Sequence, residues 1–299
     1  MIASPTAVAP MPFRQILDEA WRLARRHAKS LFLPVALPMA FWQVGLVLFQ
    51  LSSMRRAFTN LESDPMAIFG IYAAMVPMLL ASMLVGTFVY GALTTTAVDV
   101  VAGETASLAR GFRFAFRPGV FLTLWLGGVA ILIGTVLCLL PGLYLVSVLM
   151  FLIPVMRREG RHFFDAFSRC FTLGHHNPTG DFLKLPLLKS FVLLLVGYAF
   201  QAAISLVVQL PFMLVQMGTV FRKAASGADP TSLMFEGPGQ WLQLPGAFVG
   251  GLAQTAVALY ISFGVALLYS DLRRRTEGSD LEAAIDALGP SSRPPGASP

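Results

Sequence analysis

Three polar residues spaced four apart could line a path through a membrane. Gln201, Ser205 and Gln209 share one face of a helix, because four residues complete slightly more than one helical turn. Their amide and hydroxyl groups could hydrogen-bond a substrate. They could equally join two helices, which is the more usual role of such groups inside membrane proteins. The sequence leaves both interpretations open and favours helix–helix contact.

A second group combines histidine and aspartate, which are residue types that bind zinc. Its members are His162, Asp165, His175, His176 and Asp181. Adjacent histidines rarely chelate one ion together, so this pattern favours a solvated loop over a metal site. The sequence also lacks a phosphate-binding loop, a dinucleotide-binding glycine pattern, a Gly-x-Ser-x-Gly nucleophile and a His-Glu-x-x-His motif. We therefore predict a protein that is not an enzyme and that uses no metal or cofactor.

The composition excludes an ordinary soluble protein. Hydrophobic residues make up 56% of the 299 residues and charged residues only 13%, whereas soluble domains contain about 25% charged residues. The mean hydropathy is +0.68, and the charges lie between long uncharged stretches. Because the basic residues adjoin apolar segments, the net charge of +6 indicates anionic lipid rather than nucleic acid as the partner.

Six apolar stretches predict an all-α polytopic membrane protein with six transmembrane helices. Residues 13–278 form the membrane domain, and its predicted spans cover about 31–51, 67–97, 120–139, 143–156, 185–210 and 241–270. Pro141-Gly142 predicts a tight turn between the third and fourth spans, and Pro211 is expected to end the fifth. Residues 1–12 are predicted to be disordered. Residues 279–299 are predicted to form a cytoplasmic tail with a short helix and a disordered end.

The distribution of basic residues predicts how these spans are oriented. With six alternating spans, Arg55, Arg56, Arg222 and Lys223 lie on one side, and the other 18 of the 22 Lys and Arg residues lie opposite. The basic side of a membrane protein is the cytoplasmic side, so both termini are expected in the cytoplasm. The same topology places Cys138 and Cys170 on opposite sides, which excludes a disulfide between them. The first apolar stretch is too long for a cleavable signal core and is expected to remain as a span.

Three basic amphipathic stretches, at 13–29, 107–117 and 157–184, each precede a pair of spans. They share an apolar, small and aromatic residue at positions i, i+3 and i+4: Leu17/Ala20/Trp21, Leu108/Gly111/Phe112 and Phe163/Ala166/Phe167. The pattern predicts three units, each an interfacial helix followed by a transmembrane hairpin. The unequal separations of 91 and 55 residues also fit a pattern common to all amphipathic helices, so both explanations remain open.

These stretches and the residues after the last span supply the candidates for contact with lipid or a protein partner. The helices are expected to lie among the cytoplasmic headgroups, where each arginine contributes on the order of 1 kcal/mol of attraction to anionic lipid. The candidate residues are Trp21, Arg22, Arg25, Arg26, Arg110, Phe112, Arg113, Arg117, Arg161, Phe167, Arg169, Asp271, Arg273 and Glu277.

Three motifs carry a resemblance to a known group of proteins. They are Leu139-Leu140-Pro141-Gly142-Leu143-Tyr144, Pro154…Glu159-Gly160…Ala166-Phe167-Ser168-Arg169, and Tyr269-Ser270-Asp271-Leu272-Arg273…Glu277-Gly278…Asp280-Leu281-Glu282. In these motifs the chain resembles poorly characterised bacterial multi-pass membrane proteins that share the membrane domain attached to some glycerophosphoryl diester phosphodiesterases. The resemblance covers most of residues 13–288 and implies a six-helix domain in the bacterial inner membrane. It implies no phosphodiesterase activity, because the attached soluble barrel has no counterpart here.

Together these features predict a membrane scaffold or accessory protein that engages anionic lipid or a partner at the cytoplasmic face. The alternative is a transporter or a lipid-translocating channel that uses the polar stripe of the fifth span. The spans have no acidic residue near their centres, which argues against ion-coupled transport. Small residues spaced four apart predict close helix packing, within one chain rather than between two. These pairs are Ser82/Gly86, Ala199/Ala203 and Gly246/Gly250.

Overall fold

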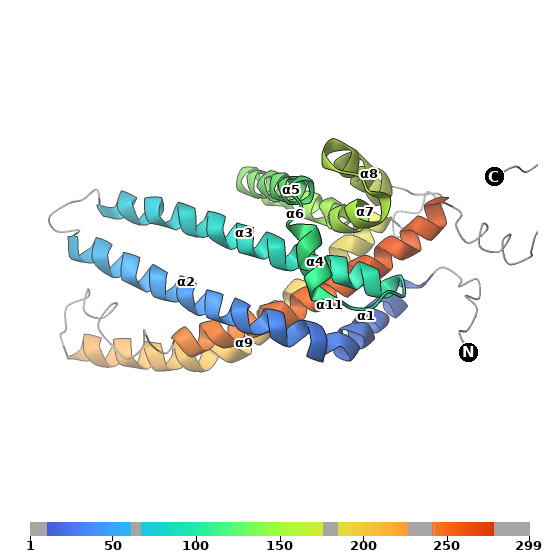
Figure 1. Ribbon diagram of the computed structural model, residues 1–299. Helices are drawn as coiled ribbons and strands as arrows, with labels where there is room; N and C mark the ends of the chain where they lie inside the picture. The colour runs from blue at the N-terminus through green and yellow to red at the C-terminus, as the bar shows by residue number, and fades with distance from the viewer. Residues whose placement is uncertain (1–10, 61–66, 176–184, 227–240, 242, 278–299) are drawn as a thin grey trace, which may run out of the picture.

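The chain is helical wherever its structure is described. The computed structural model describes residues 11–60, 67–175, 185–226, 241 and 243–277, and the regular elements among them are all helices. Six helices in this part of the chain are long and apolar enough to cross a membrane (Figure 1). The prediction of an all-α polytopic membrane protein is therefore confirmed.

The order of the elements matches the three predicted units. The elements are α1 Phe13–His27, the π-helical turn η1 Ala28–Phe32, α2 Leu33–Asn60, α3 Ala67–Val101, α4 Leu108–Ala115, α5 Pro118–Leu137, α6 Leu139–Leu149, α7 Leu152–Glu159, α8 Phe163–His175, α9 Pro186–Ala225 and α11 Gln243–Glu277. A short amphipathic helix (α1, α4 or α8) thus precedes each pair of apolar segments. The predicted disordered N-terminus falls outside the described residues except for Met11 and Pro12, and the predicted tail helix lies wholly outside them.

The apolar helices extend further than the hydropathy pattern predicts. Helix α2 continues to Asn60 and α3 to Val101. The prediction that Pro211 ends the fifth span is wrong, because α9 continues through this residue to Ala225. A proline removes only one backbone donor, and membrane helices tolerate the residue where neighbouring groups satisfy the freed carbonyl. Proline is therefore a poor marker of helix ends in this chain.

The turn between the third and fourth spans lies at Cys138, and its predicted location at Pro141-Gly142 is wrong. Cys138 has an extended backbone with φ −168° and ψ 139°. Pro141 falls in the first turn of α6, where the missing N–H group costs no hydrogen bond. A Cβ atom on Gly142 would lie 2.8 Å from the Cα atom of Thr135. The glycine therefore allows α6 to fold back tightly on α5. Pro141-Gly142 thus favours the close packing of the hairpin, although the turn itself lies three residues earlier, at Cys138. The fourth apolar segment accordingly begins at Leu139, and its second helix, α7, ends at Glu159.

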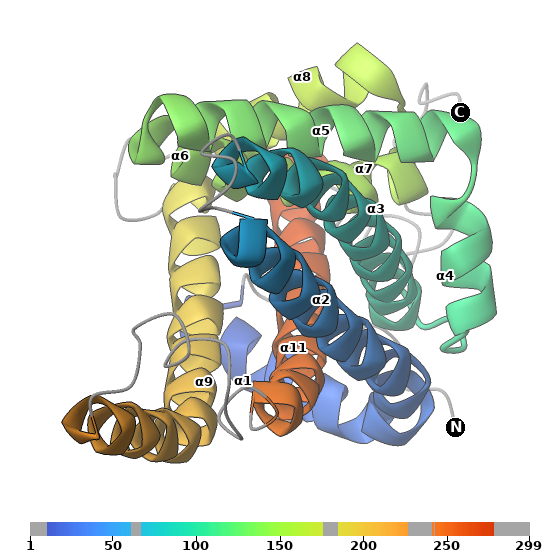
Figure 2. The ribbon, with the colours of Figure 1, turned by 90° about the vertical axis from the view of Figure 1, so that its left-hand side faces the viewer.

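The second hairpin crosses the other helices rather than running beside them. In Figure 1, α2, α3 and α11 run along the long axis of the molecule, whereas α5 is seen nearly end-on. In the view turned by 90°, α5 runs across the picture (Figure 2). The short helices α1, α4, α7 and α8 lie toward the end of the molecule that contains the last turns of α11. Helix α11 is central. In an apolar stretch of 18 residues, 67% of the residues of α11 are buried, against 11% for α9.

The closest helix approaches involve other small residues than the predicted pairs. A Cβ atom on Gly251 would lie 2.6 Å from the Cα atom of Ala40, so α11 and α2 meet backbone to backbone. In contrast, a Cβ atom on Gly86 or Gly250 would meet nothing within 4 Å. Ala199 and Ala203 are exposed on α9. Gly86, Gly250, Ala199 and Ala203 are therefore not sites of close approach, whereas Gly246 makes an ordinary contact with Phe212.

The small residues of the repeated pattern do lie at close helix contacts. Ala20 and Ala166 are fully buried, and a Cβ atom on Gly111 would collide with the carbonyl oxygen of Ala92 on α3. Each of the three short helices thus turns its small residue toward a neighbouring helix. The aromatic residues that follow are less uniform, because Trp21 is half exposed whereas Phe112 is partly buried.

Candidate functional site

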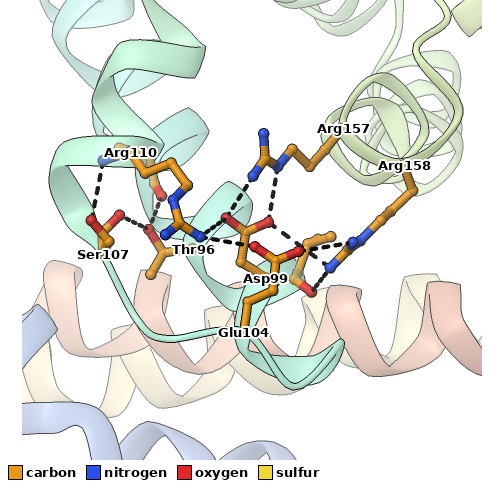
Figure 3. Close-up of polar contacts among 9 residues, drawn as sticks. Thr96, Asp99, Glu104, Ser107, Arg110, Arg157 and Arg158 are labelled. Carbon is orange, nitrogen blue, oxygen red and sulfur yellow. Dashed lines mark hydrogen bonds and ion pairs between the residues drawn. The ribbon is translucent and has the colours of Figure 1, made fainter.

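Asp99 is the most deeply buried carboxylate of a charged cluster near the end of α3. Its side chain is only 2% exposed. The guanidinium of Arg157 donates from Nε to Oδ1 at 2.8 Å and from Nη2 to Oδ2 at 2.9 Å (Figure 3). This parallel two-bond geometry is the strongest that arginine forms with a carboxylate. The pair fastens α3 to α7, which are more than fifty residues apart in the sequence.

Glu104 extends this cluster through the connection between α3 and α4. It accepts hydrogen bonds from Arg110 Nη1 at 2.8 Å and from Arg158 Nη1 at 3.2 Å. Arg158 also donates to the carbonyl oxygen of Val98 at 3.0 Å. Ser107 caps α4, because its hydroxyl accepts from the backbone N–H of Arg110 at 3.4 Å. Arg110 and Arg158 thus hold the connection against the end of α7 (Figure 3).

Glu159 forms a second cluster at the end of α7. The helix stops here because Gly160 adopts a left-handed conformation with φ 66°. The Glu159 carboxylate pairs with Arg169 Nε at 2.9 Å and with Arg161 Nε at 3.1 Å. It also accepts a hydrogen bond from the Tyr269 hydroxyl at 3.0 Å. One carboxylate therefore connects α7, α8 and α11.

Asp271 forms a third cluster near the end of α11. Its side chain is 4% exposed and pairs with Arg275 at 2.7 Å. Its Oδ1 atom accepts from the backbone N–H of Met11 at 3.1 Å, just before α1 begins. The last long helix is thereby tied to the first short helix.

The three clusters repeat one arrangement. A carboxylate near the end of the second apolar segment of each unit contacts the segment that leads into, or forms, the next short helix. Asp99 and Glu104 reach α4, Glu159 reaches α8, and Asp271 closes the ring at the start of α1. We call these carboxylates and their arginine partners the charged layer. Because arginines occupy the carboxylates, the layer is suited to fastening helices together and not to acid–base chemistry.

The sequence does not predict the charged layer. Asp99 lies at the end of an apolar stretch, and Arg157 and Arg158 are two of the 18 basic residues on the predicted cytoplasmic side, but no local pattern indicates that they pair. Their pairing crosses 58 residues, and the contact between Glu159 and Tyr269 crosses 110 residues. The available signal was the recurrence of an acidic residue after each second apolar stretch, at Glu104, Glu159 and Asp271.

The predicted lipid or partner residues divide into two groups. Arg110, Arg161 and Arg169 belong to the charged layer, Asp271 is buried within it, and Phe112 and Phe167 are partly buried. Trp21, Arg22, Arg25, Arg26, Arg113 and Arg117 are exposed. Arg273 is partly exposed and takes part in contacts of its own. The side chain of Glu277 lies outside the described residues.

The histidine and aspartate group does not form a metal site within the described part of the chain. No set of three or more His, Cys, Asp or Glu side chains there could hold an ion. His175 is instead hydrogen-bonded, with Nδ1 2.8 Å from the carbonyl oxygen of Phe171 and Nε2 3.2 Å from the Tyr144 hydroxyl. His176 and Asp181 lie outside the described residues. Burial raises the pKa of the Cys170 thiol, which keeps this residue protonated and unreactive.

A cavity of about 520 Å³ lies among α3, α5, α6, α9 and α11. Of the predicted polar stripe, Gln201 lines this cavity, whereas Ser205 and Gln209 are not among its lining residues. Gln209 is exposed, and Gln201 Nε2 donates to Ser205 Oγ at 3.4 Å. Gln254 on α11 also lines the cavity, and its Oε1 atom accepts a hydrogen bond from Gln43 Nε2 at 2.8 Å. The stripe therefore does not continue along the helix as one lined path.

No protein-family model, curated protein or solved structure matches this chain. The resemblance to the membrane domain attached to glycerophosphoryl diester phosphodiesterases therefore stays a prediction that rests on the three sequence motifs alone.

Proposed function

We propose that the protein is a membrane scaffold without catalytic activity, whose exposed arginines bind anionic lipid headgroups. The observation that carries this proposal is the division of the arginines. Those of the charged layer are neutralised by carboxylates, whereas Arg25, Arg26, Arg113 and Arg117 are exposed and form no ion pair with a described carboxylate. An arginine whose charge is not compensated by the protein retains its attraction for phosphate.

The aromatic residues of the same short helices support a location at the membrane interface. Trp21 is 50% exposed on α1, Phe116 is 60% exposed directly after α4, and Phe164 is 84% exposed on α8. Trp21 also packs against Phe200 and Tyr260, with ring centroids 6.4 and 6.3 Å apart. Exposed aromatic rings beside arginines are typical of helices that lie among lipid headgroups.

A lipid-retention experiment tests this function. The full chain and an Arg25→Gln/Arg26→Gln variant are purified from membranes, and the phosphatidylglycerol and phosphatidylethanolamine that they retain are measured by mass spectrometry. Each arginine near the surface contributes about 1 kcal/mol, so the two substitutions together are expected to weaken phosphatidylglycerol binding about thirtyfold. Unchanged retention would contradict the proposal.

Glu19→Gln/Arg22→Gln is the matched control on the same helix. Arg22 is exposed and pairs with Glu19 at 2.7 Å, so this variant removes both charges of the pair and leaves the net charge unchanged. It is expected to retain as much phosphatidylglycerol as the original protein. An equal loss in the control would indicate a general effect of substitutions in α1 and would count against specific headgroup binding.

We further propose that the protein lies in a bacterial inner membrane with both termini in the cytoplasm. The 18 basic residues assigned to one side support this orientation. Arg222 is exposed near the end of α9, on the predicted outer side. In intact spheroplasts, a membrane-impermeant maleimide is expected to label an Arg222→Cys/Cys138→Ser variant. Labelling that appears only after the membrane is opened, with Cys138→Ser alone as the negative control, would reverse the orientation.

A further inference from the structure

The cavity among the long helices lies well away from the charged layer. Gln201 follows the start of α9 by 15 residues, which corresponds to about 22 Å of helix. Tyr90 precedes the end of α3 by 11 residues, or about 16 Å. Since a hydrocarbon core is about 30 Å thick, both distances place the cavity within the apolar part of the protein.

One polar atom beside this cavity lacks a partner. Gln201 Oε1 is buried and accepts no hydrogen bond, while the amide nitrogen of the same side chain donates to Ser205. A buried acceptor without a donor is costly, and in an apolar surrounding no bulk water can compensate it. The site therefore favours a ligand that brings a hydrogen-bond donor to this oxygen.

The remaining walls define what else the ligand must be. They are largely apolar, with side chains such as Ile131, Leu194 and Ile261, and no charged residue lines the cavity. An ion or a charged headgroup would lose its hydration there without gaining a counter-charge. Tyr198 on α9 is 60% exposed, and Gln254 on α11 is exposed too, so the cavity opens to the outside of the protein between these helices.

We propose that this cavity binds a neutral lipid with one hydrocarbon chain and a free hydroxyl group. On binding, the Gln201 side chain turns its amide into the cavity, the hydroxyl donates to Oε1, and the chain occupies the apolar walls. The volume of about 520 Å³ lies within the range of roughly 300–1,000 Å³ that is usual for small-ligand sites. This inference goes beyond the scaffold function, because no arginine and no residue of α1 lines the cavity.

Photolabelling of the full chain tests the proposal. The protein is reconstituted in phosphatidylcholine nanodiscs that contain a trace of a long-chain alcohol with a diazirine in its chain, and labelled peptides are identified by mass spectrometry. Label is expected to concentrate on the cavity residues of α9 and α11. Gln201→Leu removes the acceptor and is expected to lower labelling about three- to tenfold, the range of one hydrogen bond.

Two controls and a second variant make the outcome decisive. Gln209→Leu makes the same change on the same helix, at an exposed position that does not line the cavity, and it should leave labelling unchanged. The methyl ether of the alcohol, which has no donor, should label the original protein as weakly as the alcohol labels Gln201→Leu. Ala258→Phe should reduce labelling by filling the cavity.

The proposal is overturned if cavity labelling does not exceed that of the lipid-facing residues of α9, which would leave the cavity to water or bulk lipid. It is also overturned if the alcohol and its ether label the cavity equally. Neither result affects the phosphatidylglycerol retention that tests the scaffold function, so the two proposals fail separately.

Discussion

Two regions of this protein are held together by different physical means. In the charged layer, buried carboxylates join helices through directed ion pairs such as that between Asp99 and Arg157. Among the apolar helices, contact depends on glycines that let two backbones meet, as Gly251 meets Ala40. The first region relies on the geometry of a few charged atoms, and the second relies on the absence of side-chain atoms.

The difference follows from the surroundings of each region. Lipid is as apolar as the helices themselves, so burial of apolar surface does not drive membrane helices together, and close van der Waals contact must do so. Where the long helices end, burying a charged side chain costs less free energy. Ion pairs there can specify which helix lies beside which. The ring formed by Asp99, Glu159 and Asp271 fastens each unit to the next. The apolar region adjusts the spacing between the helices that this ring selects.

Breaking the ring at its most buried member should have the largest effect. Asp99→Asn removes the negative charge that compensates Arg157, whose side chain is only 20% exposed. Loss of one partner of a buried ion pair costs about 3–5 kcal/mol, mainly because the other charge stays buried. We expect a loss of this size in the free energy of unfolding, measured by SDS titration in mixed micelles.

Two further variants distinguish this effect from a general effect of charge. Asp18→Asn breaks an exposed pair with Arg14, whose atoms are 4.0 Å apart, and it should cost less than about 1 kcal/mol. Adding Arg157→Gln to Asp99→Asn should restore part of the lost stability, because the uncompensated cation is then gone. Equal losses for Asp99→Asn and Asp18→Asn would show that the layer does not depend on burial.

The sequence predicts those parts of the fold that depend on local pattern. Hydropathy locates the six apolar segments, and helical periodicity finds the buried faces around Ala20, Gly111 and Ala166. Helix ends are predicted less well, because proline at position 141 lies where a first helical turn accepts it and proline at 211 lies inside a helix that continues. Local patterns cannot determine which neighbours replace a lost backbone hydrogen bond.

The candidate sites depend on contacts between distant residues and are therefore harder to predict. The helical spacing groups Gln201 with Ser205 and Gln209, but of these three residues only Gln201 lines the cavity. Its periodic companion Gln209 is exposed and does not line the cavity. The partners of Asp99 and Glu159 belong to other units. A single sequence does not indicate which unit contributes the partner of each carboxylate.

The glycine contact provides a smaller test in the other region. Gly251→Ala places a Cβ atom 2.6 Å from the Cα atom of Ala40 and 3.0 Å from its backbone nitrogen. Backbone cannot rotate away as a side chain can, so α2 and α11 must separate, at a cost of about 1–3 kcal/mol. We expect this loss in the same SDS titration used for Asp99→Asn.

Gly250→Ala is the neighbouring control, because its Cβ atom meets nothing within 4 Å. Alanine favours helix over glycine by up to about 1 kcal/mol, so this variant should be neutral or slightly more stable. Opposite signs at adjacent positions on one helix can arise only from the contact with Ala40, since helix propensity is the same at both. If both variants were stabilising, α2 and α11 would not meet at Gly251, and the apolar region would lack the close contact that distinguishes it from the charged layer.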